Sequence, residues 1–185
     1  MTLPVTGSQT VGPFFRIGMA PLFREEFAPE GMTGERVTVE GRVLDGEGHG
    51  VPDAQIEIWQ ADAQGKYFDA ESTEPSAFRG FGRVPTNERG EFRFTTIKPG
   101  CVAGPGEVTQ APHLVVLVFM RGLLRHLVTR IYFEGEAANA NDPVLALVPA
   151  ERRETVMAER ESGSTGTFVW NIRLQGEDET VFFDV

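Results

Sequence analysis

Residues 114–120 read LVVLVFM, and this unbroken run of apolar side chains decides the fold class. The run is far shorter than the roughly 20 apolar residues that a membrane-spanning helix needs. Valine, which favours strands, is its commonest residue, and Ala111-Pro112 and Gly122 bound it. A run of this length and composition predicts a central β-strand with both faces covered.

Shorter segments in which apolar and polar residues alternate lie on both sides of this run. They read RVTVEGRVL at 36–44, AQIEIW at 54–59, EFRFTTI at 91–97, LRHLVTRIYF at 124–133, TFVWNIRL at 167–174 and TVFFD at 180–184. Alternation with a period of two is typical of half-buried strands, and glycine and proline turns separate these segments. The pattern predicts a mostly β fold, a two-sheet β-sandwich, with one short helix at 150–161 after Pro149.

Two stretches lack this alternation. Residues 1–35 are punctuated by glycine and proline, yet they carry large apolar side chains between Phe14 and Phe27. Apolar groups in such number favour packing on another surface, so we predict an N-terminal arm at 1–35 that forms an interface or an active-site wall. The β-sandwich domain then spans 36–185. Residues 60–90 are predicted to form a long functional connection.

Composition narrows the classes of function. The net charge of −10 repels a phosphate backbone, so we expect no nucleic-acid partner. No apolar run is long enough for a membrane span, and the first residues do not resemble a secretory signal, which favours a cytoplasmic protein. Cys101 is the only cysteine and follows the turn Pro99-Gly100. We interpret it as a small structural side chain rather than a catalytic thiol.

Residue types alone indicate no reaction. His49 lies in a glycine-rich turn and is expected to be exposed, whereas His126 could be core, interface or substrate-facing. His113 opens the apolar run and fits a structural role better than a ligand role. The chain has no paired-histidine metal motif, no phosphate-binding loop and no nucleophile elbow.

Several longer words of the sequence resemble the intradiol ring-cleavage dioxygenases. They are IEIWQADAQGKY at 56–67, FGRVPTNERGEFRFTTIKPG at 81–100, APHLVVLVFMRG at 111–122 and TRIYFEGE at 129–136. SQTVGPFF at 8–15 and QGEDETVFFDV at 175–185 resemble in particular the metal-free subunit of the two-subunit members of that family. The resemblance covers nearly the whole chain. It implies a β-sandwich and a ferric enzyme that cleaves a catechol ring with O2.

The resemblance also implies which positions would hold iron. Family members bind Fe(III) through two tyrosinates and two imidazoles, a set of hard anionic and nitrogen donors that suits ferric iron. The matching positions here are Tyr67, Val102, His113 and Val115. Gln110 replaces an arginine of the family pattern. Since neither valine has a donor atom, we expect no metal and no catalytic residue in this chain, with Tyr67 and His113 as vestigial positions.

By the same resemblance, a partner beta chain keeps all four ligands and holds the Fe(III), and the active site lies between the chains. The implied substrates are protocatechuate and O2. Arg130 matches an arginine that faces the substrate, and a guanidinium is a natural partner for a ring carboxylate. Thr10, Gly12, Pro13 and Phe14 match an arm segment that approaches the site, with Phe14 standing where the family often has tyrosine.

Two alternatives stay open at this point. The chain could be a self-sufficient catechol-type dioxygenase, which would need its own complete ligand set. It could instead be a transthyretin-like β-sandwich that binds a ligand without chemistry, which explains the missing ligands equally well.

Overall fold

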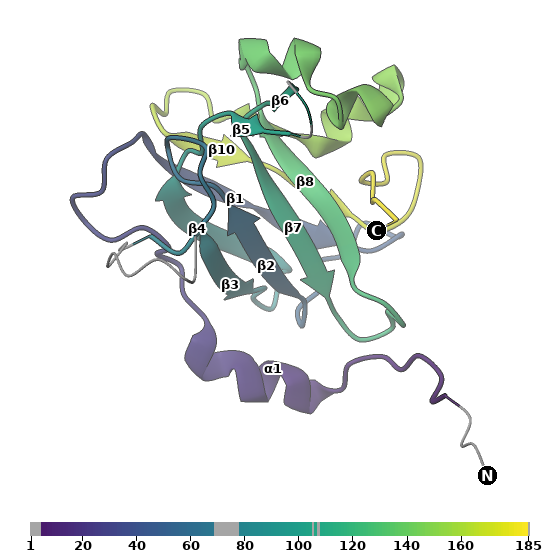
Figure 1. Cartoon of the computed structure of the whole chain (residues 1–185). Coiled ribbons are helices and arrows are strands. Elements are labelled where there is room, and N and C mark those ends of the chain that lie inside the picture. Colours follow the sequence, from purple (N-terminus) through teal and green to yellow (C-terminus); the bar gives the residue numbers. More distant parts are fainter. Residues whose placement is uncertain (1–4, 69–77, 105, 107, 185) are drawn as a thin grey trace.

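The computed structural model describes residues 5–68, 78–104, 106 and 108–184. Its strands form two layers that enclose one apolar core (Figure 1). The first layer contains β1 (Arg36–Leu44), β4 (Glu91–Ile97), β9 (Met157–Arg160), β10 (Thr167–Val169) and β11 (Ile172–Arg173). The second contains β2 (Gln55–Gln60), β3 (Phe81–Pro85), β7 (His113–Phe119) and β8 (Leu127–Phe133). The predicted mostly β sandwich is therefore confirmed.

The two layers are joined along one side. The hydrogen-bonded order is β11-β1-β10-β9-β8-β7-β2-β3, and β4 adds to β1. Strand β9 makes the junction, because it pairs antiparallel with β10 and parallel with β8. A separate ribbon of β5 (Val102–Ala103) and β6 (Thr109–Gln110) lies at one end of β7 (Figure 1).

Strand β7 shows how the core is built. Leu114, Val116 and Val118 point between the layers and are fully buried. Alternate residues point to the outer face, where Val115 is only half-buried. The expectation that both faces of the run are covered is thus correct for the inner face and wrong for much of the outer one. An apolar, half-open outer face is available for contact with another surface.

The helical prediction was correct in its start and wrong in its type and length. Residues predicted as a helix at 150–161 form a 3₁₀ helix, η4 (Ala150–Val156), and then strand β9. Pairing on both sides of β9 buries Ala158 and outweighs the local helical preference of this charged segment. The one α-helix among the described residues, α1 (Pro13–Met19), lies in the predicted arm and begins with proline at its first position, which proline favours.

Other boundaries also differ from the prediction. Strand β3 lies inside the predicted long connection at 60–90, strand β8 begins at Leu127, and the segment 167–174 is broken between β10 and β11. Residues 180–184 form no strand and contribute one isolated bridge, Phe183 to Val128. Short 3₁₀ turns complete the described chain: η1 (Ala20–Leu22), η2 (Ala137–Asn141) and η3 (Leu145–Leu147). None of the described helices is long and apolar enough to cross a membrane.

The arm returns to the sandwich after α1. Phe27 stacks on Phe94 at 5.0 Å between ring centroids, and its amide donates to the carbonyl of Thr95 at 2.9 Å. The same ring lies directly over Gly82, where an added Cβ would come within 2.1 Å of a ring carbon. Glycine at this position of β3 therefore makes room for the arm.

Replacing Gly82 by alanine should loosen this attachment. The added methyl would displace the Phe27 ring, and overpacking of this kind costs about 1–3 kcal/mol of unfolding free energy. Thermal or denaturant unfolding of the purified protein measures it. Gly7→Ala is the matched control, because nothing lies within 4 Å of its added Cβ and it lies outside the helices and strands. Equal stability of the two variants would contradict this account of the arm.

Candidate functional site

The four positions of the implied ligand set come together near the β5–β6 end of the second layer. In the sheet register Trp59 of β2 lies beside Val115 of β7, and the Trp59 and Tyr67 rings stack at 6.3 Å. Val102 of β5 pairs with Gln110 of β6. His113 lies two residues before Val115 and therefore points to the same face of β7. Segments far apart in sequence thus converge where the family motifs imply.

The two positions that keep donor atoms differ in their surroundings. Tyr67 is 38% exposed, and burial of its ring raises the pKa of its hydroxyl, partly opposed by the charge of Arg130. His113 is 1% exposed, and its Nδ1 lies 2.7 Å from the carbonyl oxygen of Ala111. Because that oxygen can only accept, Nδ1 carries the proton and Nε2 keeps its lone pair. Burial, and then the positive charge of Arg130, lower the pKa of His113.

The other two positions offer nothing to a metal. Val102 and Val115 carry only carbon side chains, and Val102 is buried at 6% exposure. No group of three or more histidine, cysteine, aspartate or glutamate side chains within the described ranges could hold a metal ion. Only a phenol and an imidazole remain of the four donors of the family, so the residues of this chain do not fit its ferric ion.

The guanidinium of Arg130 lies next to one of the two valines that occupy ligand positions. Arg130 of β8 is directly opposite Val115 in the antiparallel register. Its Nη1 donates to Oε1 of Gln110 at 2.8 Å and to the hydroxyl oxygen of Tyr132 at 3.3 Å. Within the described residues, its Nε and Nη2 make no hydrogen bond. The guanidinium is thus held by one nitrogen and presents the remaining edge for a carboxylate, the geometry that favours two parallel bonds.

Two residues of this cluster were not identified from the sequence, Tyr132 and Asp142. Both are fully or almost fully buried, at 0% and 1% exposure. The Tyr132 hydroxyl donates to Oδ1 of Asp142 at 3.0 Å. Burial raises the pKa of Tyr132 so that it stays neutral. No local motif marks Asp142, which follows a run of small residues and looks like an ordinary turn aspartate.

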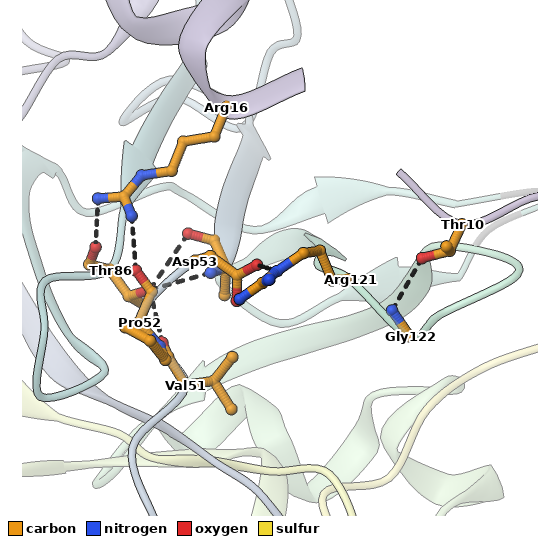
Figure 2. A network of polar contacts seen from close by, with 9 residues as sticks. Thr10, Arg16, Val51, Pro52, Asp53, Thr86, Arg121 and Gly122 are labelled. Carbon is orange, nitrogen blue, oxygen red and sulfur yellow. Dashed lines mark hydrogen bonds and ion pairs between the residues drawn. The ribbon is translucent and has the colours of Figure 1, made fainter. Parts of the chain in front are cut away.

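The arm residues lie at the other end of the same layer. The Thr10 hydroxyl accepts a hydrogen bond from the amide of Gly122, at 2.8 Å, in the turn between β7 and β8 (Figure 2). Gly12 is the N-cap of α1 and Pro13 its first residue. Phe14 is 82% exposed and makes no ring contact with the described part of the chain.

Helix α1 is fastened to the sandwich by one arginine. Figure 2 shows Arg16 reaching from α1 to two backbone carbonyls, those of Pro52 at 2.6 Å and Thr86 at 2.9 Å. The neighbouring ring of Phe15 contacts Phe119 of β7 at 5.6 Å. With these inward residues bound, Phe14 and Ile17 point away, and Ile17 is 65% exposed.

Arg130 and the arm therefore lie on the same outer face of the second layer, at separate places along it. Val115 and Phe119 lie on the same face of β7, four residues apart, which corresponds to roughly 13 Å along a strand. Arg130 lies opposite Val115, and Phe15 of the arm packs on Phe119. A surface docked on this face would contact both regions.

The remaining sequence candidates do not join the site. His49 is exposed, as expected, in the turn that Asp45 stabilises. His126 lies just before β8, not within it, and is exposed with its ring stacked on Phe119 at 5.2 Å. Cys101 is exposed, so the interpretation of it as a small packed side chain was wrong. Its thiol has no acid–base partner among the described contacts.

The buried His113 should give the protein a pH-dependent stability. Its pKa is lowered in the folded state, so the unfolded chain binds the proton first as the pH falls below about 6.5. The free energy of unfolding should then fall by up to about 1.4 kcal/mol per pH unit and be unaffected by this group above that pH. His113→Asn, which keeps a donor near Ala111, should flatten this slope in denaturation series at several pH values. The exposed His126→Asn should not, and an unchanged slope in His113→Asn would contradict the assignment.

Comparison with known proteins agrees with this arrangement. The family model described as "Dioxygenase" matches residues 12–176. The protocatechuate 3,4-dioxygenase alpha chain of Burkholderia cepacia is 45% identical over 100% of this chain and 99% of its own length. The beta chain of the same organism is 30% identical over 96% of this chain and 78% of its own.

A solved structure, the 3-chlorocatechol 1,2-dioxygenase of Rhodococcus opacus 1CP, shares the fold. Its TM-score is 0.68 at 20% identity, over 93% of this chain and 68% of that one. At that identity the likeness speaks for the fold alone. The family match and the full-length relatives carry the assignment, and they exclude an unrelated binding module of similar shape. The chain belongs to the intradiol ring-cleavage dioxygenase family.

Proposed function

We propose that this chain is the metal-free alpha subunit of a protocatechuate 3,4-dioxygenase and that it completes an active site whose iron is held by a beta chain. One observation carries the proposal: Arg130, whose Nε and Nη2 make no hydrogen bond with the described residues, lies opposite Val115, one of the two valines at ligand positions. A self-sufficient enzyme does not fit that set of donors. The full-length identity to alpha chains supports the same assignment.

The reaction follows from the family chemistry. Protocatechuate and O2 react to 3-carboxy-cis,cis-muconate, with cleavage of the bond between the two hydroxyl-bearing carbons and uptake of both oxygen atoms. An Fe(III) held by the partner chain would supply the activation of the catechol ring toward O2. In this chain, Arg130 binds the ring carboxylate and so orients the ring. A single cysteine is consistent with a reducing compartment, and we place the enzyme in the cytoplasm.

The arm supplies the second contribution to the shared site. Thr10, Gly12, Pro13 and Phe14 form a segment held by Arg16 and Gly122, with the Phe14 ring directed outward. Exposed apolar side chains on α1, Phe14 and Ile17, are typical of a surface that another protein covers. We therefore assign this segment to the wall of the partner's substrate pocket. Without a tyrosine hydroxyl at position 14, its contribution there is ring contact and shape.

Truncating Arg130 tests the role of this chain in the assembled enzyme. Protocatechuate is a carboxylate above about pH 5, so Arg130→Ala removes a charge-assisted bond worth about 1.5–3 kcal/mol. The KM for protocatechuate should rise roughly 10- to 100-fold, whereas the KM for plain catechol should change little. Steady-state O2 uptake with both substrates measures the difference.

Two further variants test whether the effect is specific to the guanidinium of Arg130. Arg130→Lys keeps the charge and loses the planar fork. Its KM for protocatechuate should therefore lie between that of the wild type and that of Arg130→Ala. Arg93→Ala removes an arginine from strand β4 in the other layer, 65% exposed, and should leave both KM values as they are. If Arg130→Ala affects the two substrates equally, Arg130 is not the carboxylate partner.

A further inference from the structure

Arg130 is held in place by a buried network that ends in a single carboxylate. Its Nη1 is shared between two acceptors, Oε1 of Gln110 and the hydroxyl oxygen of Tyr132. Because Nη1 donates to both acceptors, they together fix the rotation of the guanidinium. The edge formed by Nε and Nη2 makes no hydrogen bond with the described residues. A long arginine side chain otherwise loses considerable rotamer freedom when it binds an anion.

Asp142 controls both of these acceptors. Its Oδ1 accepts from the Tyr132 hydroxyl at 3.0 Å, which turns that hydroxyl's lone pairs toward Arg130. Its Oδ2 accepts from the amide of Ala111 at 2.7 Å, which fixes the backbone immediately after Gln110. A carboxylate that is 1% exposed thus reaches Arg130 by two routes, one through a side chain and one through the main chain.

The carboxylate is itself firmly placed. Oδ1 also accepts from the amides of Val144 at 2.9 Å and Leu145 at 2.7 Å, at the start of η3. A buried carboxylate needs such donors to offset its desolvation, and here they make it a fixed point. The hydrogen bonds are donated in one direction, from the guanidinium to the Tyr132 hydroxyl and from that hydroxyl to the carboxylate. In a chain of this kind each bond strengthens the next.

We propose that Asp142 is a positioning residue for substrate, acting through Tyr132 and Gln110 to preorient Arg130 toward the ring carboxylate. This inference rests on the proposed role of Arg130. Neither Tyr132 nor Asp142 needs to touch the substrate, since both are buried behind the guanidinium. Their effect is to reduce the entropy that Arg130 loses on binding, so it should be confined to substrates with a carboxylate.

Kinetics of the assembled enzyme test this with two side-chain changes. Tyr132→Phe removes only the hydroxyl, and Gln110→Ala removes the other acceptor. Each should raise the KM for protocatechuate by roughly 3- to 10-fold, with kcat and the KM for catechol unchanged. Asp142→Asn should raise it further, because the lost charge weakens the bond from Tyr132 and the new amide nitrogen faces the Ala111 N–H, donor against donor. If Asp142→Asn does not fold, the first two variants still decide the question.

A double-mutant cycle separates positioning from independent effects. In an Arg130→Ala background, Tyr132→Phe and Gln110→Ala should have no further effect on the KM for protocatechuate. The same fold-increase in that background, or an equal increase with catechol, would overturn the positioning role. If Arg130→Ala raises the KM and neither Tyr132→Phe nor Gln110→Ala does, positioning fails and the proposed function stands. If Arg130→Ala itself leaves the KM unchanged, the proposed function fails and the positioning role falls with it.

Discussion

The antiparallel register of β7 and β8 is the constraint on which the site depends. It sets Arg130 opposite Val115 and Tyr132 opposite His113, all on the outer face of the second layer. Because side chains alternate between faces, a slip of one residue would turn Arg130 into the apolar core. That slip is prevented by Leu114, Val116 and Ile131, which fill the core from the other face of the same strands. The packing that makes the sandwich stable therefore also places the cation.

The chemistry of this region differs from that of a metal site in a consistent way. Where a ferric site needs anionic donors, this chain has two valines, a neutral tyrosine and a neutral histidine beside a guanidinium. Such surroundings repel a metal cation and suit an anion. Since the chain as a whole carries a net charge of −10, an anionic substrate depends on this local cation rather than on long-range attraction. The proposed division of labour between a metal-binding and a carboxylate-binding subunit fits this electrostatic pattern.

The long alternating segments allowed an accurate prediction from sequence. Strands β1 and β4 have the predicted bounds, since period-two alternation over seven or more residues reports directly on burial. Short elements were missed because tertiary contacts decide them. Strand β9 exists through its pairing with β8 and β10, and α1 is held by Arg16 and Phe15. Apart from Pro13 at the start of α1, local sequence carries neither signal.

The site was only partly predictable for a related reason. The family motifs predicted Arg130 and the four ligand positions, because these residues lie in recognisable words of the family or, for Val102, two residues after one. Asp142 lies outside any such word, and its proposed role depends on the fold, which brings the Ala111 amide and the Tyr132 hydroxyl to its two carboxylate oxygens. The proposed roles of the arm residues depend on a second chain. No pattern within this sequence specifies that geometry.

The central claim, that this chain completes a ferric site without binding iron, is tested most directly by metal analysis with visible spectroscopy. The chain should be purified alone and together with a co-expressed beta chain. The account predicts about one iron per alpha–beta pair, with a tyrosinate-to-ferric absorption band, in the complex and neither in the chain alone. Stoichiometric iron and the same band in the isolated chain would contradict it, because Val102 and Val115 could then not be the reason for a missing metal.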